Sequence, residues 1–265
     1  MKRNKIRIFL YVLFIGVFCA AGIAYYKTQA DYAADRAVYD GAADAYVTAA
    51  PEPVPSQEPE PEPEPGPELA GPAPISVDFG ELLAECPDVQ GWIYCEDTEI
   101  NYPVVQGKDN NQYLRHAYTG EYAVAGSIFV EAANAPGFAD SNTIIYGHHM
   151  KDGSMFNCLS SWADQAFCES HKNMWLLTPE GDYRVDLFSG YVTPAGSDAY
   201  AVFQGPSEHF DEYLKMAAGN SDFEADVELG RDSRYVMLST CDYTYKDARY
   251  VLHGKLVPCA APDDE

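Results

Sequence analysis

The chain has 265 residues, enough for one medium-sized folded domain plus extensions. Its formal net charge is −24 at pH 7, from 41 acidic and 17 basic residues, and this acidity argues against nucleic acid as a partner. The negative charge is most simply a solvated, solubilising surface and indicates no particular substrate.

The N-terminus combines positive charge with a long apolar run. Residues 1–7 (MKRNKIR) carry four basic side chains, and residues 8–26 are unbroken apolar sequence, long enough to cross a bilayer as a helix. Since basic segments stay inside, this pattern predicts a cytoplasmic tail, a single-pass membrane anchor and an extracytoplasmic remainder. A cleaved signal peptide is the alternative, because Ala20, Ala21 and Ala24 supply small residues. The length of the run favours the uncleaved anchor.

Residues 27–75 are expected to form an extracytoplasmic stalk and spacer. The segment 27–50 is rich in alanine, aspartate and tyrosine, which fits either a short helix or an unstructured chain. Residues 51–74 alternate proline with glutamate, so they cannot bury a core. Extended in the polyproline form, this segment would reach roughly 75 Å and hold the next domain off the membrane. A disordered tether with no required length is the alternative.

Residues 76–258 are expected to form a mostly β domain, followed by an acidic tail at 259–265. An amphipathic pattern with Phe79, Leu82, Leu83 and Cys86 on one face predicts an opening helix. Further helices are predicted at 155–167 and 206–218, and strands at 92–94, 100–105, 126–130, 143–146, 175–177, 183–192 and 200–203. Pro103 suggests an edge position for its strand. Many short strands and a closing hairpin indicate a closed β-barrel.

The closing hairpin spans residues 235–257. Two apolar, β-favouring runs, 236–238 and 250–252, flank the polar turn DYTYKD. If the two strands pair across that turn, Cys241 and Arg249 come close together at its mouth. A neighbouring cation favours the nucleophilic thiolate, and a guanidinium can stabilise an oxyanion, so this pair points to acyl transfer through a thioester. The alternatives are a buried structural cysteine and an ion pair of Arg249 with an aspartate of the turn.

Acyl transfer also needs a proton carrier for the leaving amine. The segment 142–156 (NTIIYGHHMKDGSMF) reads as a buried strand ending at Gly147, which presents His148 where the strand ends. His149 is the nearest rival. A zinc site at the two histidines is disfavoured, because no third ligand follows at a recognisable spacing. His253 on the closing strand is expected to be a packed core group.

Taken together, LSTC (238–241), the following Arg249, YGHHMKDGSMF (146–156) and INYPVVQGKDN (100–110) resemble the sortase family, most closely class B, over residues 80–257. The resemblance implies an eight-stranded barrel with an N-terminal helix and a helix before the final hairpin. It also implies that Cys241 is the nucleophile, His148 the general acid and base, and Arg249 the group that stabilises the oxyanion. Ser239 and Thr240 would contact the substrate.

The same resemblance implies the reaction. A sorting motif of the Pro-x-Thr type, near the C-terminus of a secreted protein, would be cleaved at threonine and joined to an amine of the peptidoglycan stem or bridge, with no metal or cofactor. A cysteine hydrolase with the same site and a non-catalytic wall-associated module are the alternatives. The remaining cysteines are expected to be small buried hydrophobic residues, with a Cys158–Cys168 bridge as the other possibility.

Overall fold

The computed structural model describes residues 2–50 and 69–260 of the chain. Most of the proline- and glutamate-rich segment, residues 51–68, and the end of the acidic tail, residues 261–265, lie outside the described residues.

Eight strands close into a barrel in the order β10-β8-β7-β3-β4-β5-β6-β9. They are β3 (Val89–Tyr94), β4 (Asn101–Val105), β5 (Ile128–Val130), β6 (Asn142–Tyr146), β7 (Asn173–Leu177), β8 (Tyr183–Pro194), β9 (Arg234–Cys241) and β10 (Ala248–Pro258). Side chains alternate across β9, so Val236 and Leu238 join the main hydrophobic core while Met237 packs in a second cluster on the other face. The closed eight-stranded barrel expected from the sequence is confirmed.

Two expectations about strands were wrong. Residues 200–203 do not form a strand: Asp198–Tyr200 is a 3-10 turn, η3, and Phe203 makes only an isolated bridge to Asn142. The strand that carries Pro103 is not at an edge either, because β4 pairs with β3 on one side and with β5 on the other. Pairing with β5 begins only at Val104, so the missing N–H of Pro103 costs the barrel no hydrogen bond there.

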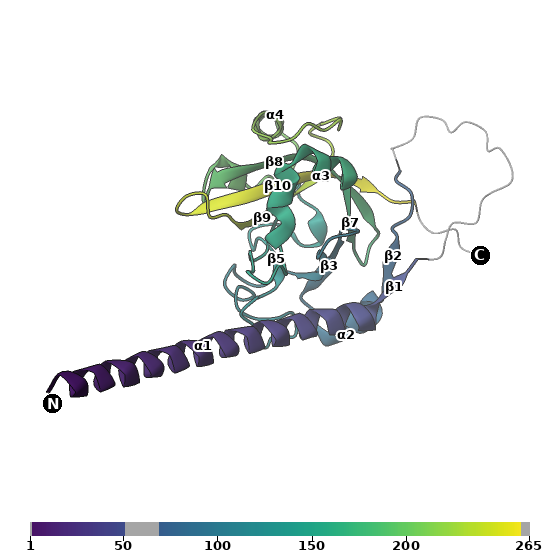
Figure 1. Cartoon of the computed structure of the whole chain (residues 1–265). Helices are drawn as coiled ribbons and strands as arrows, with labels where there is room; N and C mark the ends of the chain where they lie inside the picture. The colour runs from purple at the N-terminus through teal and green to yellow at the C-terminus, as the bar shows by residue number, and fades with distance from the viewer. Residues whose placement is uncertain (1, 51–68, 261–265) are drawn as a thin grey trace, which may run out of the picture.

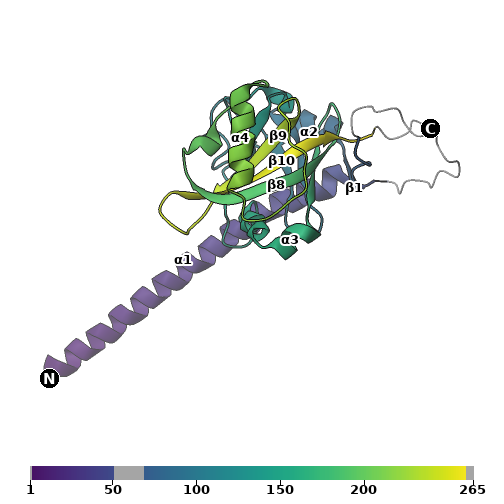
Figure 2. The ribbon, with the colours of Figure 1, turned by 90° about the horizontal axis from the view of Figure 1, so that it is seen from above.

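The helix before the final hairpin is α4 (Glu208–Gly219). Ser207 caps it by accepting a hydrogen bond from Phe210 N, and its buried face carries Phe210, Tyr213, Leu214 and Ala217. These side chains pack with residues of β8, β9 and β10 in the second hydrophobic cluster. Figures 1 and 2 show α4 lying across the outer face of those three strands.

The other helices that follow α1 in the chain are short. They are α2 (Phe79–Glu85), α3 (Gln165–Ser170) and the 3-10 turns η1 (Pro136–Phe138) and η2 (Asn157–Ala163). Asp78 begins α2 by accepting a hydrogen bond from Glu81 N, and Leu82 is its buried residue. The opening helix expected from the sequence therefore ends before β3.

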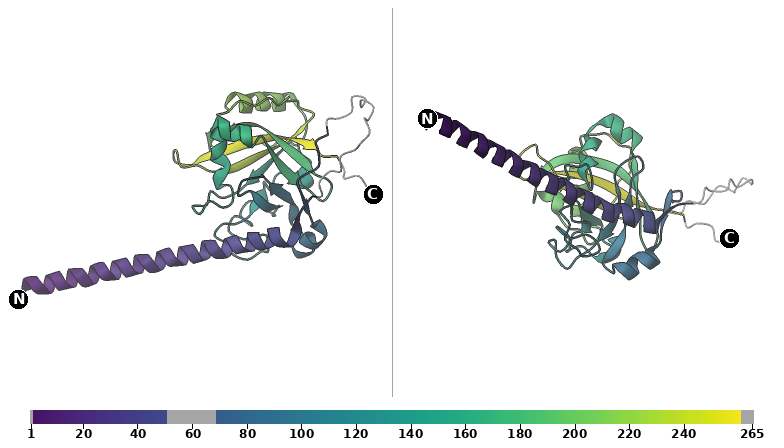
Figure 3. Two further views of the ribbon diagram at one scale, coloured as in Figure 1. Left: turned by 45° about the vertical axis from the view of Figure 1, so that its right-hand side comes forward. Right: turned by 60° about the horizontal axis from the view of Figure 1, so that its bottom comes forward.

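The N-terminal helix, α1 (Lys2–Tyr46), is longer than expected. It runs without a break from the basic tail through the apolar run, and its last turns lie along the barrel (Figures 1 and 3). Tyr39 and Ala42 are 3% and 2% exposed and belong to the barrel's hydrophobic core, with Tyr32 and Tyr46 packed against it. The segment 27–46 is therefore a helix that forms part of the folded domain.

The residues on either side of the proline- and glutamate-rich segment pair with each other. After α1, β1 (Val47–Ala49) pairs antiparallel with β2 (Ile75–Val77), and Ala50 N donates to Pro74 O at 3.0 Å. Ala70, just after the segment, pairs with Cys259. Both flanks of the segment are therefore attached to the domain, while the expected spacer at residues 51–68 lies outside the described residues.

Candidate active site

Cys241 ends β9 and lies directly opposite Arg249, near the start of β10. Directly opposite residues of an antiparallel pair project from the same face, so the thiol and the guanidinium are neighbours. Both residues are partly exposed. Arg249 Nη1 donates to Ala248 O at 2.8 Å, and among residues 2–50 and 69–260 no ion pair involves Arg249. Its charge is therefore free to act on a bound group beside the thiol.

His148 is brought to this end of the barrel by β6. Strand β6 runs parallel to β9 with Tyr146 opposite Ser239, and Gly147 N donates to Ser239 O at 3.0 Å. Continuing this register by two residues brings His148 level with Cys241. Gly147 is needed at the turn, because a Cβ there would lie 2.5 Å from the ring of Phe156.

A backbone carbonyl holds the His148 ring. His148 Nε2 lies 2.8 Å from Leu114 O, so this nitrogen donates its proton to the carbonyl. Burial lowers the pKa of His148 below its ordinary value of 6.5; the carbonyl opposes this shift, and the nearby charge of Arg115 adds to it. At neutral pH most molecules therefore carry a neutral imidazole here.

His149, the rival histidine, contacts the β9–β10 turn. Its ring meets Tyr243 edge-on, with centroids 5.1 Å apart, and its Nδ1 is buried without a hydrogen-bond partner. Of the two histidines, His148 has its ring oriented by a hydrogen bond among the described residues.

Aromatic side chains form a wall beside Cys241. Tyr200 OH lies 2.7 Å from Ser239 Oγ, and the Tyr200 ring stacks on Tyr146 with centroids 6.3 Å apart. Tyr146 OH in turn donates to Glu131 Oε2 at 2.8 Å. Burial raises the pKa of Tyr200, while the Ser239 hydrogen bond and then the charge of Arg249 oppose that shift. Tyr200 thus lies close both to Ser239 and to the Cys241–Arg249 pair.

Sequence reasoning missed Tyr146 and Tyr200. Tyr146 shares a face with Ser239 because their strands are parallel neighbours, which becomes visible only once that pairing is known. Tyr200 lies in η3, a segment expected to be a strand, and it carried no signal in the sequence.

Thr240 does not face the same side as Cys241. It is 2% exposed, and its hydroxyl is buried without a hydrogen-bond partner among the described residues. Side chains alternate along β9, so Ser239 and Cys241 point outward while Thr240 points into the barrel. The contact of Thr240 with the substrate, expected from the sequence, stays a prediction.

Of the other cysteines, Cys86, Cys95 and Cys168 are buried as expected, whereas Cys158 and Cys259 are half-buried and Cys19 is exposed. His253 is 1% exposed, with Nε2 3.1 Å from Tyr213 OH, which confirms it as a core group. All seven cysteines are unpaired, so there is no Cys158–Cys168 bridge. Within residues 2–50 and 69–260, no three His, Cys, Asp or Glu side chains cluster as a metal site would require.

Comparison with known proteins finds relatives of this chain in sequence and in fold. Residues 93–257 match the family model of the sortase domain. The chain is 41% identical to sortase B of Listeria monocytogenes over 174 residues, 64% of this chain and 70% of that protein. A structure of sortase B from B. anthracis in complex with AAEK1 superposes with a TM-score of 0.69 at 32% identity, covering 87% of this chain and 99% of that one. A Staphylococcus aureus sortase B–substrate complex gives a TM-score of 0.65 at 32% identity, covering 69% and 85%.

Proposed function

The chain belongs to the sortase family, as a class B cysteine transpeptidase, and from this premise we propose that Cys241 is its nucleophile, His148 its general acid and base, and Arg249 its oxyanion-stabilising group. The observation that carries these assignments is the register, which sets Arg249 opposite Cys241 and Tyr146 opposite Ser239, so that His148 follows β6 where Cys241 ends β9.

The first half of the reaction forms a thioester. The Cys241 thiolate attacks the carbonyl carbon of the threonine in a sorting motif, and the guanidinium of Arg249 stabilises the negative charge that develops on the carbonyl oxygen. When the tetrahedral intermediate collapses, protonated His148 gives its proton to the departing amine. Because burial lowers the pKa of His148, this protonated form is a minority at neutral pH.

The second half transfers the acyl group. A free amine of the peptidoglycan stem or bridge attacks the thioester carbonyl, and neutral His148 accepts the proton that the amine loses. The C–S bond then breaks and returns Cys241 as a thiolate, so the product is an amide between the secreted protein and the wall. The identity of the amine is part of the proposal.

The sorting peptide is proposed to lie in extended form along the Tyr146–Tyr200–Ser239 wall. Sortases act on a sorting-motif peptide, and one structural neighbour is a sortase B–substrate complex. In this chain, the hydroxyls of Ser239 and Tyr200 supply polar contacts beside the nucleophile, and the tyrosine rings supply an apolar surface.

We also propose that α1 anchors the enzyme in the membrane. One helix among the described residues, α1, is long and apolar enough over part of its length to cross a bilayer. Its continuity through residues 8–26 into the packed segment supports an uncleaved anchor with the basic tail in the cytoplasm and the barrel outside. Packing on the barrel begins at Tyr32, about 9 Å along the helix from Tyr26, so the barrel would sit at the membrane surface.

The catalytic end of the barrel would face that membrane. Figures 1 to 3 show the turn between β9 and β10 projecting toward the side of the N-terminal half of α1. Cys241 and Arg249 lie at the base of this turn. The site would thus open toward the bilayer surface and not toward the distal wall.

The test uses the full chain in detergent micelles and fluorescence-quenched peptides carrying LPxTG or NPxTx, with and without a small amine. We expect an amide product, a thioester adduct of Cys241 in mass spectra, and loss of both in Cys241→Ala, His148→Ala and Arg249→Ala. His149→Ala and Cys259→Ala serve as controls and should stay active. Cleavage unaffected by the amine would identify a hydrolase, and activity in the Cys241→Ala variant would refute the assignment.

A further inference from the structure

The second half of α1 presents polar side chains to a loop of the barrel. Asp35 is 9% exposed, and its Oδ2 accepts a hydrogen bond from Ala125 N at 2.8 Å. Tyr39, also buried, donates through its hydroxyl to Gly126 O and lies 3.2 Å from Ser127 Oγ. The backbone at 125–127 is therefore held by the membrane helix.

The same loop holds the carbonyl that orients His148. Ser127 N donates to Tyr113 O at 3.0 Å, and Ser127 Oγ donates to His116 O at 2.8 Å. Gly126 lies so close to residues 113–114 that a Cβ on it would be 2.5 Å from Leu114 O. Leu114 O is the acceptor for His148 Nε2. Contacts thus run without interruption from α1 through residues 125–127 and 113–116 to the imidazole.

A second set of contacts reaches the loop that follows His148. Arg36 donates to Glu99 Oε2 at 3.0 Å and to Asp152 O at 3.1 Å. Asp152 Oδ1 accepts from Ser154 Oγ at 2.7 Å, and Phe156 N in the same loop donates back to His148 O at 3.0 Å. Residues 113–116 and the 148–156 loop, which both contact His148, are therefore both held by side chains of α1.

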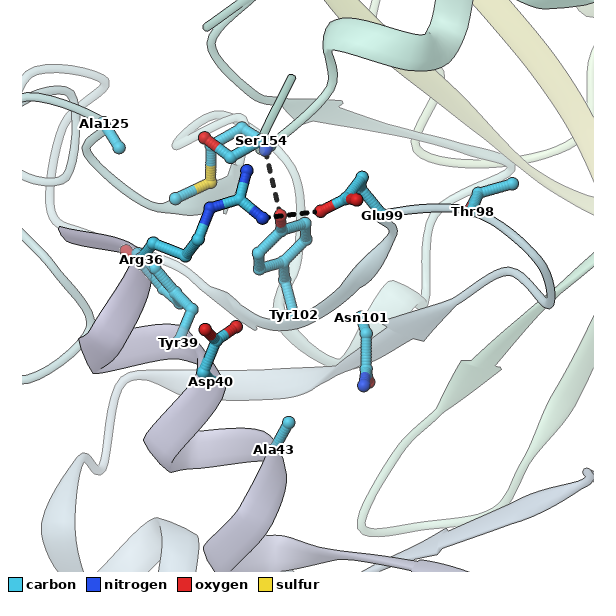
Figure 4. A pocket seen from close by; sticks show the side chains of 11 residues that line it. Arg36, Tyr39, Asp40, Ala43, Thr98, Glu99, Asn101, Tyr102, Ala125 and Ser154 are labelled. Carbon is cyan, nitrogen blue, oxygen red and sulfur yellow. Dashed lines mark hydrogen bonds and ion pairs between the residues drawn. The ribbon is translucent and has the colours of Figure 1, made fainter. Parts of the chain in front are cut away.

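Polar contacts matter here because packing is incomplete. A cavity of about 190 Å³ lies between α1 and the barrel, lined by Arg36, Tyr39, Asp40, Glu99 and Tyr102 among others (Figure 4). Figure 4 shows Arg36 reaching from α1 toward Glu99 across this space. Atoms that line a void lose dispersion contacts on that side, so directed hydrogen bonds decide how α1 sits on these loops.

We propose that Asp35, Arg36 and Tyr39 are positioning residues for the transpeptidase reaction, which hold His148 in place for proton transfer by bracing the Leu114 carbonyl and the 148–156 loop against α1. The proposal rests on the role assigned to His148. It makes α1 part of the support of the active site. The support is specific to His148, because Asp35, Arg36 and Tyr39 make no hydrogen bond to the elements that carry Ser239, Tyr200 and Arg249.

The experiment compares Asp35→Ala, Asp35→Asn and Tyr39→Phe in the full chain in detergent micelles, with Asp44→Asn on the exposed face of α1 as the matched control. A misplaced proton carrier slows the chemical step, so kcat for transfer to a small amine should fall about 10- to 100-fold in Asp35→Ala with KM within about twofold. Asp35→Asn keeps an oxygen that can accept from Ala125 N and should lose less. Tyr39→Phe removes one hydroxyl and keeps the buried ring. If Asp35→Ala fails to fold, this variant tests whether the contacts of α1 position His148.

A second readout separates positioning from stability. The His148 titration is followed by NMR with 13C-labelled histidine and assigned with His148→Ala. Loosening residues 125–127, and with them the Leu114 carbonyl, should expose the ring, so its pKa should rise toward 6.5 in Asp35→Ala and Tyr39→Phe, with Arg115 as the charged group that acts on the ring in all forms. Asp44→Asn should leave it unchanged.

Unchanged kcat and an unchanged His148 pKa, with only a lower Tm, would overturn the proposal and leave α1 a purely stabilising role. His148→Ala keeps the two hypotheses apart. If it remains active, the assigned role of His148 fails; if it is inactive while Asp35→Ala and Tyr39→Phe match the wild type, only the positioning role fails.

Discussion

Gly126→Ala, paired with Gly120→Ala, tests whether the Leu114 carbonyl matters to catalysis. Both glycines have left-handed backbone angles, with φ of +58° and +87°, so alanine costs about 1–2 kcal/mol of strain at either position. They differ in what a Cβ would meet. At Gly120 nothing lies within 4 Å, whereas at Gly126 Leu114 O would be 2.5 Å away and Tyr113 O 2.8 Å away.

The size of the displacement follows from these contacts. A carbon and a carbonyl oxygen normally approach to about 3.3 Å, so Leu114 O must move by roughly 0.8 Å relative to residue 126. The contact of His148 Nε2 with Leu114 O is 2.8 Å, and a shift of that size is enough to break it. Since misplacing a catalytic group by about 1 Å can cost about 100-fold in rate, we expect kcat to fall about 10- to 100-fold.

The assay measures kcat and Tm of both variants in the full chain. Strain alone should lower Tm by about 2–8 °C in Gly120→Ala, while kcat stays within about twofold of the wild type. Gly126→Ala should lose both stability and rate. Equal kcat values for the two variants would refute the idea that the carbonyl holds the imidazole for proton transfer.

Three further perturbations address other parts of the molecule. Replacing residues 51–68 by a short Gly/Ser linker should leave transfer in membrane-reconstituted enzyme within about twofold, because both flanks already pair with the domain; a large loss would restore the spacer role. Tyr200→Phe removes the partner of Ser239 and should raise KM for the peptide about three- to tenfold, and an unchanged KM would take Ser239 out of the binding wall. Burial lowers the pKa of His253 to about 3, below the ordinary 6.5, so the unfolded state binds more protons between these values and stability falls as pH drops from about 6.5 toward 3. His253→Gln should reduce that loss by about 1 kcal/mol per pH unit, measured as Tm against pH, and identical pH profiles would contradict the assignment.

Much of the barrel was predictable because its signals are local. The alternation of apolar residues in the final hairpin predicted its two strands, and the polar turn between them predicted how Cys241 and Arg249 pair. The helix α4 followed from the spacing of its apolar residues. These patterns depend on residues close together in the chain, which is why they could be recognised without the fold.

The course of α1 beyond Tyr26 was not predictable in the same way. Asp35 and Tyr39 are polar, and their sequence context resembles an exposed stalk. They are buried because backbone groups at 125–127, some ninety residues away, need hydrogen-bond partners that these side chains supply. Nothing in the local sequence identifies such a partner.

By itself, the amino-acid sequence determined most strands of the barrel, the long apolar run near the N-terminus, and the presence of a cysteine, an arginine and a histidine suited to acyl transfer. Only the tertiary structure decided that Ser239 shares a face with Cys241 while Thr240 faces the interior, that Leu114 O orients His148, and that Ala50 and Pro74, on either side of the proline-rich segment, are hydrogen-bonded to each other. The physical reason is that backbone carbonyls and pairing registers carry no side-chain signature, so their partners are chosen when distant segments pack together.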